Sequence, residues 1–305
     1  MRRTDAFKNL PQIHPPVART IKHPGRRDPW RLWLDMTKRP QLGRGKSLPS
    51  IATPRWRAEL LPKAPYEASY VASAPVIGFA FEAQSGTHAF AGDRRSRFSA
   101  KPNHLSFVPR GCDVYSQSAE GGEYLKVTLL DEAEMLTRSE RRFTNLIDRV
   151  SVVAAEALRR RLLADPDRDL LDCERLVAML TARARGVLDG RPTTDRAAAW
   201  MTSRRLKHVQ GIVEQRLGER LTVGDLAESL GLSPSFFSRA FSAALGKPPH
   251  DYIIDRRLAR ARQLLSAGTD DIAGVAQLCG FSSHAHLSSV CRARLGVPPS
   301  RLAGR

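Results

Sequence analysis

Residues 222–245 read TVGDLAESLGLSPSFFSRAFSAAL, and they decide how the C-terminal part of this 305-residue chain folds. Thr222 with Asp225 three residues later has the arrangement of a capping box, which predicts that a helix begins there. Gly231 supplies a tight corner, because glycine reaches positive φ at little cost. Ser233, followed by proline, then predicts the start of a new helix. The stretch therefore predicts a helix, a three-residue turn and a second helix.

The second of these helices divides into two faces. Its apolar residues fall on one side at helical spacing: Phe237, Ala240, Phe241 and Leu245. The opposite side carries short polar groups and one arginine: Ser235, Ser238, Arg239 and Ser242. A helix that enters the major groove of DNA needs this division, since one face packs against the preceding helix and the other meets base edges. We interpret residues of about 222–246 as a helix-turn-helix motif.

The same arrangement occurs again in residues 271–295, which read DIAGVAQLCGFSSHAHLSSVCRARL. Gly280 takes the place of the corner glycine, and Ser282 or Ser283 caps the helix that follows, which predicts a second motif at about 270–296. Between the motifs a helix opened by two prolines runs for about 18 residues, or roughly 27 Å. Two motifs on such a spacer reach successive major-groove segments about 34 Å apart.

From Leu206 to Arg305 the chain resembles the DNA-binding domain of the AraC/XylS family. The matching residues of the first unit are Leu226, Ala227, Ser233, Phe237, Ser238, Arg239, Ala240, Phe241, Gly246, Pro249, Tyr252, Arg257, Leu258, Ala261, Leu264 and Leu265. Those of the second unit are Ile272, Val275, Ala276, Gly280, Phe281, Ser282, Leu287, Gly296 and Pro299. The resemblance implies a sequence-specific transcription regulator, not an enzyme, that binds double-stranded promoter or operator DNA and contacts RNA polymerase if it is an activator.

The resemblance also implies which side chains read bases. In the first motif they correspond to Ser235, Ser238 and Arg239, beside which Ser242 lies on the same predicted face. In the second motif they correspond to His284, Ala285, Ser288 and Ser289. The family usually has an arginine where Ser289 stands and an aromatic residue where Cys291 stands, so we expect the second motif to read sequence more loosely. On the spacer helix, Arg256 and Arg260 are expected to contact phosphates.

Positive charge is concentrated at the two ends of the chain, whose formal net charge is +18. Residues 1–54 hold 12 basic and 3 acidic residues, residues 55–199 hold 22 and 20, and residues 200–305 hold 15 and 8. Basic ends suit an anionic partner, most often nucleic acid. The first 54 residues are also rich in proline, so we predict a basic tail that is disordered; alternatively, natural translation starts at Met36.

Residues 55–130 show short alternating apolar stretches separated by turns, which is typical of an antiparallel sandwich or small barrel. Members of the resembled family often carry a cupin-like barrel at this place. An interior lined by apolar side chains would hold a small organic effector, or would simply be a filled core; the residues are Phe79, Phe81, Phe107 and Leu125. The sequence does not identify an effector or its pocket. His88 and His104 stand alone, so no metal is expected.

Residues 131–190 change to a helical period. We expect one helix from about Arg142 to Ala164 and another from Leu170 to Gly190, forming an antiparallel hairpin. Its leftover apolar edge would join two copies into a homodimer, or would pack on the β domain. The expected fold class is α+β: a cupin-like β domain with a helical hairpin at 55–190, a linker at 191–203 and an all-α double helix-turn-helix domain at 204–305.

Four scattered cysteines, Cys112, Cys173, Cys279 and Cys291, match no common zinc pattern and suggest reduced, buried thiols in a cytoplasmic protein without a cofactor. No stretch is apolar enough to suggest a membrane partner. Two other functions remain open. A DNA-repair methyl acceptor carries a similar helix-turn-helix domain but needs an activated cysteine. An architectural protein would bind DNA without sequence preference.

Overall fold

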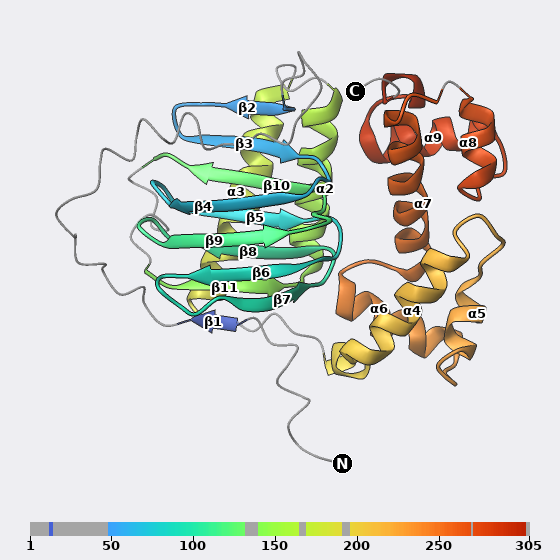
Figure 1. Cartoon of the computed structure of the whole chain (residues 1–305), viewed down its shortest axis with the longest axis horizontal. Helices are drawn as coiled ribbons and strands as arrows, with labels where there is room; N and C mark the ends of the chain where they lie inside the picture. The colour runs from blue at the N-terminus through green and yellow to red at the C-terminus, as the bar shows by residue number, and fades with distance from the viewer. Residues whose placement is uncertain are drawn as a thin grey trace. The chain divides into compact units, whose positions relative to one another are not determined.

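The computed structural model describes residues 12–14, 48–131, 140–164, 169–190, 196–269 and 271–302, which form two compact units (Figure 1). The β unit contains the described residues between 12 and 146 and between 177 and 190. The helical unit contains those between 147 and 176 and between 196 and 302. The division falls inside the predicted domain 55–190, because its first helix groups with the C-terminal helices.

The β unit consists of two antiparallel sheets, as the alternating pattern predicts. The larger sheet has the order β1 (Gln12–His14), β11 (Arg142–Leu146), β8 (His104–Val108), β5 (Val76–Ala80), β10 (Tyr124–Leu129), β3 (Trp56–Leu61) and β2 (Ser50–Ala52). The smaller sheet has the order β4 (Tyr66–Val71), β9 (Asp113–Ser118), β6 (Gln84–Phe90) and β7 (Ser96–Ala100). Together with the helices, these sheets confirm the predicted α+β class.

The central strands of the larger sheet have one apolar face and one face of small and polar residues. Phe79 lies opposite Leu105 and Leu125 in the ladder, and all three are at most 1% exposed. One residue earlier, Gly78 lies opposite Ser106 and Lys126, so these three share the other face.

The polar face is the one turned toward the smaller sheet. The Tyr124 hydroxyl lies 3.2 Å from Ser106 Oγ, and a Cβ on Gly78 would collide with that hydroxyl. Burial raises the pKa of Tyr124, and the phenols of Tyr70 and Tyr66 on β4 raise it further. The face turned toward the smaller sheet is therefore not the apolar face that the sequence suggested. The interpretation that Phe79, Phe81, Phe107 and Leu125 line the interior of a barrel is wrong. Alternation places Phe79, Phe107 and Leu125 on the face turned away from the smaller sheet, and the Phe81 ring packs edge-on against Phe79 at 5.0 Å. Figure 1 shows α3 (Leu170–Leu188) running across this sheet.

The expected helix from Arg142 to Ala164 is in fact a strand followed by a helix. Residues 142–146 form β11, whose Phe143 and Leu146 lie opposite Phe107 and Leu105 of β8. The helix α2 (Arg149–Ala164) begins only after Asp148, whose carboxylate accepts from the N–H groups of Val150 at 3.0 Å and Ser151 at 3.3 Å. A side-chain cap at that point fixes the start of the helix. The predicted second helix, from Leu170 to Gly190, is confirmed by α3, which runs from Leu170 to Leu188.

Two other boundaries need correction. Strands β1 and β2 fall within residues 1–54, so those short stretches belong to the larger sheet rather than to a disordered tail; Ile51 is only 7% exposed against it. Most of the remaining tail lies outside the described residues. Residues 196–200 of the expected linker form a 3-10 turn, η4 (Arg196–Trp200), that packs on the helical unit with Met201 fully buried.

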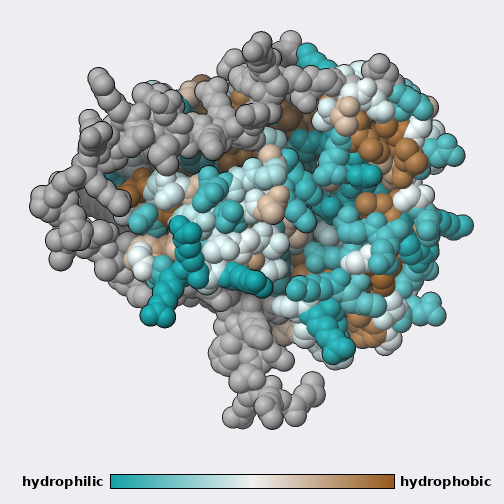
Figure 2. Space-filling model, in the orientation of Figure 1, coloured by the Kyte–Doolittle hydropathy of each residue, from teal (hydrophilic) through white to brown (hydrophobic). Residues whose placement is uncertain are grey.

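The helical unit continues with α4 (Ser203–Gln215), α5 (Val223–Glu228), α6 (Pro234–Leu245), α7 (Pro249–Ser266), α8 (Ile272–Leu278), α9 (His284–Leu295) and the turn η5 (Pro299–Arg301). The core around the first motif includes Phe237, Phe241 and Tyr252. The Phe241 ring lies between the other two and contacts both. Figure 2 shows hydrophilic side chains over much of the visible face of this unit, with separate apolar patches between them. Among the described helices, none has the length and apolar character needed to cross a membrane.

Candidate nucleic-acid interface

The first motif forms as the sequence predicts, from α5, a glycine corner and α6. Thr222 Oγ1 accepts from the N–H of Asp225 at 3.1 Å, and the Asp225 carboxylate accepts from the N–H of Thr222 at 3.0 Å. The hydrogen bond from the Thr222 N–H to the Asp225 carboxylate is the main reason that the pKa of Asp225 lies below its usual range. Gly231 takes a φ of 65°, and Ser233 caps α6 through the N–H of Phe236 at 3.4 Å. Local side-chain chemistry therefore fixes where α6 begins.

The two faces of α6 are also as predicted. Its apolar residues Phe237, Ala240, Phe241 and Leu245 are all fully buried. Ser235 and Arg239 are exposed, while Ser238 and Ser242 are half-buried. The first turns of α6 thus present hydroxyl groups and one guanidinium to solvent, the donor and acceptor set that can meet base edges in a major groove.

The second motif repeats this construction with α8 and α9. Asp271 caps α8 through the N–H of Gly274 at 2.8 Å, and Gly280 makes the corner with a φ of 75°. Of the two serines proposed as the cap of α9, Ser283 is the one, since its hydroxyl accepts from the N–H of His286 at 3.1 Å.

The predicted reading residues of α9 are less uniform than those of α6. His284, Ala285 and Ser289 are exposed, whereas Ser288 is 8% exposed and its hydroxyl lies 3.5 Å from His284 Nε2. Ser288 therefore contacts the ring of His284 and presents little surface of its own. The exposed surface of α9 carries an imidazole, a methyl group and a hydroxyl, but no arginine in the position of Arg239.

The two predicted phosphate-binding arginines of α7 differ in environment. Arg260 is exposed. Arg256 is half-buried, and its guanidinium pairs with the carboxylate of Glu214 on α4 at 2.5 Å. A DNA phosphate would have to compete with this carboxylate for Arg256. The guanidinium of Arg260 is therefore the more accessible of the two to a phosphate.

Two features of the unit were not found from sequence. The first is the role of Arg257, which the sequence identified only as one of the residues that match the family. Its guanidinium donates to three backbone carbonyls, of Leu217 at 2.9 Å, Glu219 at 2.6 Å and Gly280 at 2.8 Å. It thus connects the segment between α4 and α5 with the corner of the second motif. Its match to the family pattern offered a signal, but that match does not name the three carbonyls that it contacts.

The second feature is a ladder of rings and guanidiniums beside α6. The Arg205 guanidinium lies 4.7 Å from the centre of the Trp200 ring, which meets the Phe236 ring edge-on at 4.9 Å. The Arg239 guanidinium lies 5.4 Å from the same Phe236 ring. Cation–π contacts of this kind favour a fixed orientation of the arginine. The turn η4 therefore helps to orient Arg239, although its residues were assigned to a linker.

No group of three or more His, Cys, Asp and Glu side chains among the described residues is arranged to hold a metal ion. The chemistry of this surface is that of hydroxyl, imidazole and guanidinium groups.

Comparison with known proteins finds a match in the part of the chain that contains the two motifs. Residues 226–305 match the profile of a helix-turn-helix domain family. The chain is similar to a probable transcriptional regulator, LumQ, of Photobacterium leiognathi, with 34% identity over 93 residues, which are 30% of this chain and 38% of LumQ. It is also similar to the HTH-type transcriptional regulator ExsA of Pseudomonas aeruginosa, with 25% identity over 229 residues, which are 68% of this chain and 80% of ExsA.

Among solved structures, a transcriptional regulator of Chromobacterium violaceum described as having an AraC-type DNA-binding domain shares 33% identity. The alignment covers 33% of this chain and 89% of that one, with a TM-score of 0.32. The alignment with LumQ spans well under two thirds of that protein's length. The matched profile, together with two capped and glycine-cornered motifs, identifies the C-terminal part of the chain as a helix-turn-helix domain of the AraC type.

Proposed function

We propose that this protein is a sequence-specific DNA-binding transcription regulator whose base-reading residues lie on α6 and α9. The observation that carries the proposal is that both helices begin at a serine cap and expose polar side chains in their first turns, while their other faces bury large apolar residues. These are Phe237, Phe241 and Leu245 in α6 and Leu287 and Leu295 in α9. A helix N-terminus with exposed polar groups is the part that recognition helices insert into the major groove. Five of the predicted residues are exposed and accessible for this role: Ser235, Arg239, His284, Ala285 and Ser289.

The test is a selection of binding sites from random double-stranded DNA with the full-length protein at fixed salt concentration. A regulator of this kind should enrich one motif with two conserved segments about one helical turn apart. Enrichment of no motif, with binding that depends only on salt, would identify a non-specific architectural protein instead.

The environment of the cysteines opposes the repair alternative. Cys112, Cys173, Cys279 and Cys291 are all buried, and burial raises the pKa of each thiol, that of Cys291 to about 12. A methyl acceptor needs a thiolate that the alkylated base can reach. We therefore propose that the protein does not accept alkyl groups, and incubation with DNA carrying labelled methyl groups should leave the protein unlabelled.

For the β unit we propose binding of a small organic effector with polar groups. The inner faces of the two sheets bring hydroxyl and amide groups together: Tyr66 Oη lies 3.2 Å from Ser116 Oγ and 3.4 Å from Gln84 Oε1. Tyr124 and Ser106 form a similar pair on the facing sheet. Such an interior favours ligands that form hydrogen bonds over purely apolar ones.

A thermal-shift screen of the full chain against hydroxylated and carboxylated metabolites tests this proposal. A hit should lose its effect in Tyr124→Phe, which keeps the ring and removes the hydroxyl. Failure of every compound class to raise the melting temperature would favour the filled-core alternative.

We also propose that the protein forms a homodimer through apolar side chains of α2 and the start of α3. Val150 and Val153 are 44% and 55% exposed, and Leu170 and Leu171 are 44% and 78% exposed. Val150 and Val153 lie in the first turns of α2, and Leu170 and Leu171 lie in the first turn of α3. Large apolar side chains exposed to solvent are typical of an interface. Light scattering should give twice the chain mass, and Leu171→Lys should shift it toward the monomer, whereas a monomeric wild type would contradict the proposal.

A further inference from the structure

The helix α2 contacts the C-terminal ends of both recognition helices. Helices α6 and α9 each end at a glycine in the left-handed conformation, Gly246 with φ 73° and Gly296 with φ 75°. A Cβ on Gly246 would lie 2.7 Å from Cγ2 of Val152, near the start of α2. A Cβ on Gly296 would lie 3.1 Å from the Cβ of Ala164, at the end of α2. The two ends of one helix thus rest against equivalent places of the two motifs.

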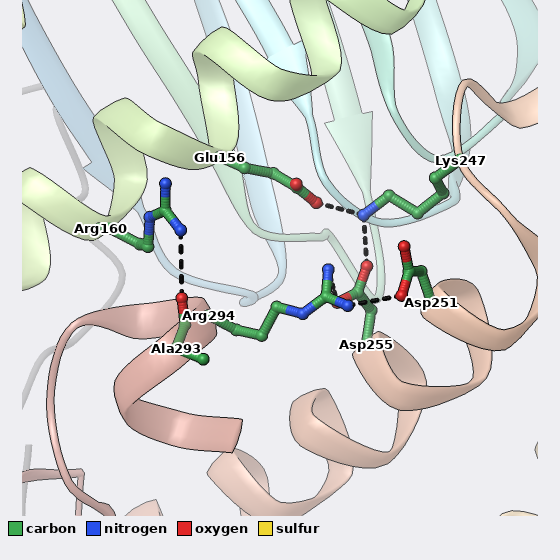
Figure 3. Close-up of polar contacts among 7 residues, drawn as sticks. All are labelled: Glu156, Arg160, Lys247, Asp251, Asp255, Ala293 and Arg294. Carbon is green, nitrogen blue, oxygen red and sulfur yellow. Dashed lines mark hydrogen bonds and ion pairs between the residues drawn. The ribbon is translucent and has the colours of Figure 1, made fainter. Parts of the chain in front are cut away.

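A cluster of charged side chains adds polar contacts between α2 and the two motifs (Figure 3). Its members are Glu156, Arg160, Lys247, Asp251, Asp255 and Arg294. Lys247, directly after Gly246, is 6% exposed, and its ammonium group pairs with the carboxylates of Glu156 on α2 and Asp255 on α7. The cluster therefore joins α2 to the loop that follows the first recognition helix and to the spacer helix.

The second recognition helix joins the same cluster. Arg294 on α9 donates to Asp251 Oδ1 at 2.6 Å, and its other terminal nitrogen lies 4.0 Å from Asp255 Oδ1 (Figure 3). Arg160 on α2 donates to the carbonyl of Ala293 at 3.1 Å. Burial alone would lower the pKa of the Arg294 guanidinium, but Asp255 and Asp251 outweigh it and raise that pKa. Asp255 thus forms ion pairs with residues of both motifs, with Lys247 after the first recognition helix and with Arg294 on the second.

This arrangement bears on how the two motifs are held. If α7 were the only connection, the motifs would be free to twist about its axis and to bend where it begins and ends. Arg257 adds a contact on the side of the glycine corner of the second motif. The helix α2 adds contacts at the other ends of α6 and α9, between Val152 and Ala164, which are roughly 18 Å apart along the helix. Contacts on separate sides of α7 oppose both twisting and bending.

We propose that α2 is a positioning element of the DNA-binding unit, in which Glu156, Lys247 and Arg294 hold the two recognition helices at one separation and angle and thereby set the spacing of the DNA site. The proposal rests on the proposed function. The charges of this cluster predict what happens when one of its members is replaced. A buried ammonium or carboxylate without its partner is unfavourable, so α2 should separate from the motifs while each motif stays folded around its own core.

The DNA test uses the selected site and versions of it with one base pair added or removed between the two conserved segments. One base pair moves the second groove segment by about 3.4 Å and about 34°. We expect the wild-type protein to bind the altered sites at least about tenfold more weakly, and Glu156→Gln and Lys247→Met to reduce this penalty to about threefold or less. Arg149→Gln, which neutralises an exposed charge at the start of α2, is the matched control and should keep the full penalty.

A second measurement does not depend on DNA. Nitroxide labels on Ser235→Cys and Ser289→Cys, both exposed positions on the two recognition helices, report the distance between the helices by pulsed electron resonance. The buried native thiols should label slowly. The wild-type background should give one narrow distance distribution, Glu156→Gln a broad one, and Arg149→Gln the wild-type one. Circular dichroism confirms folding of each variant, and Arg294→Lys replaces any variant that fails to fold.

The outcomes separate the two proposals. A narrow distribution and an unchanged spacing penalty in Glu156→Gln would overturn the positioning role of α2. Absence of any preferred sequence in the wild type would overturn the proposed function alone, and the distance measurement would then decide the role of α2. A broad distribution in Glu156→Gln, with helix content preserved, supports it in either case.

Discussion

The guanidinium of Arg257, on the helix between the two motifs, donates a hydrogen bond of 2.8 Å to the carbonyl of Gly280 at the corner of the second motif. The same side chain reaches back to the carbonyls of Leu217 and Glu219, which precede the first motif. Arginine suits this place because its planar group presents several donors in fixed directions. A single side chain therefore connects two segments that are far apart in the sequence.

We expect Arg257→Ala to lower the free energy of unfolding of the helical unit by about 1–3 kcal/mol, the cost of leaving partly buried carbonyls without partners. Arg257→Lys should recover only a part of this, because an ammonium group cannot reach three carbonyls in the same geometry. Urea unfolding followed by circular dichroism measures the effect. Arg260→Ala, an exposed arginine of the same helix, is the control and should change stability by less than about 0.5 kcal/mol. Equal effects of the two alanine variants would contradict the role of Arg257.

Phe241→Ala should destabilise the first motif by about 3–5 kcal/mol. The Phe241 ring is fully buried and lies 5.5 Å from that of Phe237 and 5.4 Å from that of Tyr252. Its removal leaves a cavity at the junction of α6 and α7. Thermal unfolding monitored at the helical signal checks this. A melting curve identical to that of the wild type would mean that the ring contributes little to the core.

The features that could be predicted from sequence are those set by neighbours in the chain. The cap at Thr222, the corners at Gly231 and Gly280 and the cap at Ser233 all depend on side chains within about four residues, and each is found where it was expected. The exposed and buried faces of α6 follow from one helical period. Local chemistry therefore gave the first motif almost completely.

The features that sequence could not give depend on distant partners. Alternation in β5 and β10 separates two faces, but both are covered, so it could not say which face meets the smaller sheet. The residues of β11 have a helix-like spacing of apolar side chains, and only their ladder with β8 makes them a strand. Lys247 and Glu156 are 91 positions apart, and no periodicity connects them.

Titration of Cys291 should make stability fall at alkaline pH. Burial raises the pKa of this thiol to about 12, whereas an unfolded cysteine titrates near about 8.5. The folded state therefore favours the neutral form, and its contribution is complete below about pH 8.5 and is lost as the pH rises toward 12. The expected slope is about 1.4 kcal/mol per pH unit in that window. Because buried tyrosines titrate in the same direction, the measured quantity is the difference between the wild type and Cys291→Ala. A difference that does not vary between pH 8 and pH 10.5 would contradict it.

Shortening the N-terminal segment should distinguish residues that belong to the sheet from those that do not. A chain that begins at Leu48 keeps β2, with Ile51 buried and the carbonyl of Pro49 accepting from the N–H of Leu60 at 2.9 Å. A chain that begins at Arg55 loses these contacts. Calorimetry should show the β unit of the second chain melting about 5 °C below that of the first. Equal melting temperatures would mean that β2 adds nothing to the sheet.

The two recognition helices should contribute unequally to sequence preference. Arg239 can donate two hydrogen bonds to one guanine, which discriminates against other bases by about 1–3 kcal/mol. It is exposed and is oriented by the Phe236 ring, which Trp200 contacts in turn. We therefore expect Arg239→Ala to flatten the preference in one segment of the site. The measurement is the dissociation constant on a panel of sites with single base substitutions at one salt concentration.

At the second recognition helix the exposed candidates are weaker. Ser289 has one short hydroxyl, and the His284 ring lies beside the buried Ser288, which restricts its orientation. Ser289→Ala should weaken binding by less than about 1 kcal/mol and leave the preferred sequence unchanged, because a lone hydroxyl pairs with more than one base. The second motif would then mainly hold phosphates and fix the register of the protein on DNA. If Ser289→Ala alters base preference as much as Arg239→Ala does, this asymmetry is wrong. If Arg239→Ala weakens every sequence equally, the arginine contacts a phosphate and base reading must be assigned to the serines of α6.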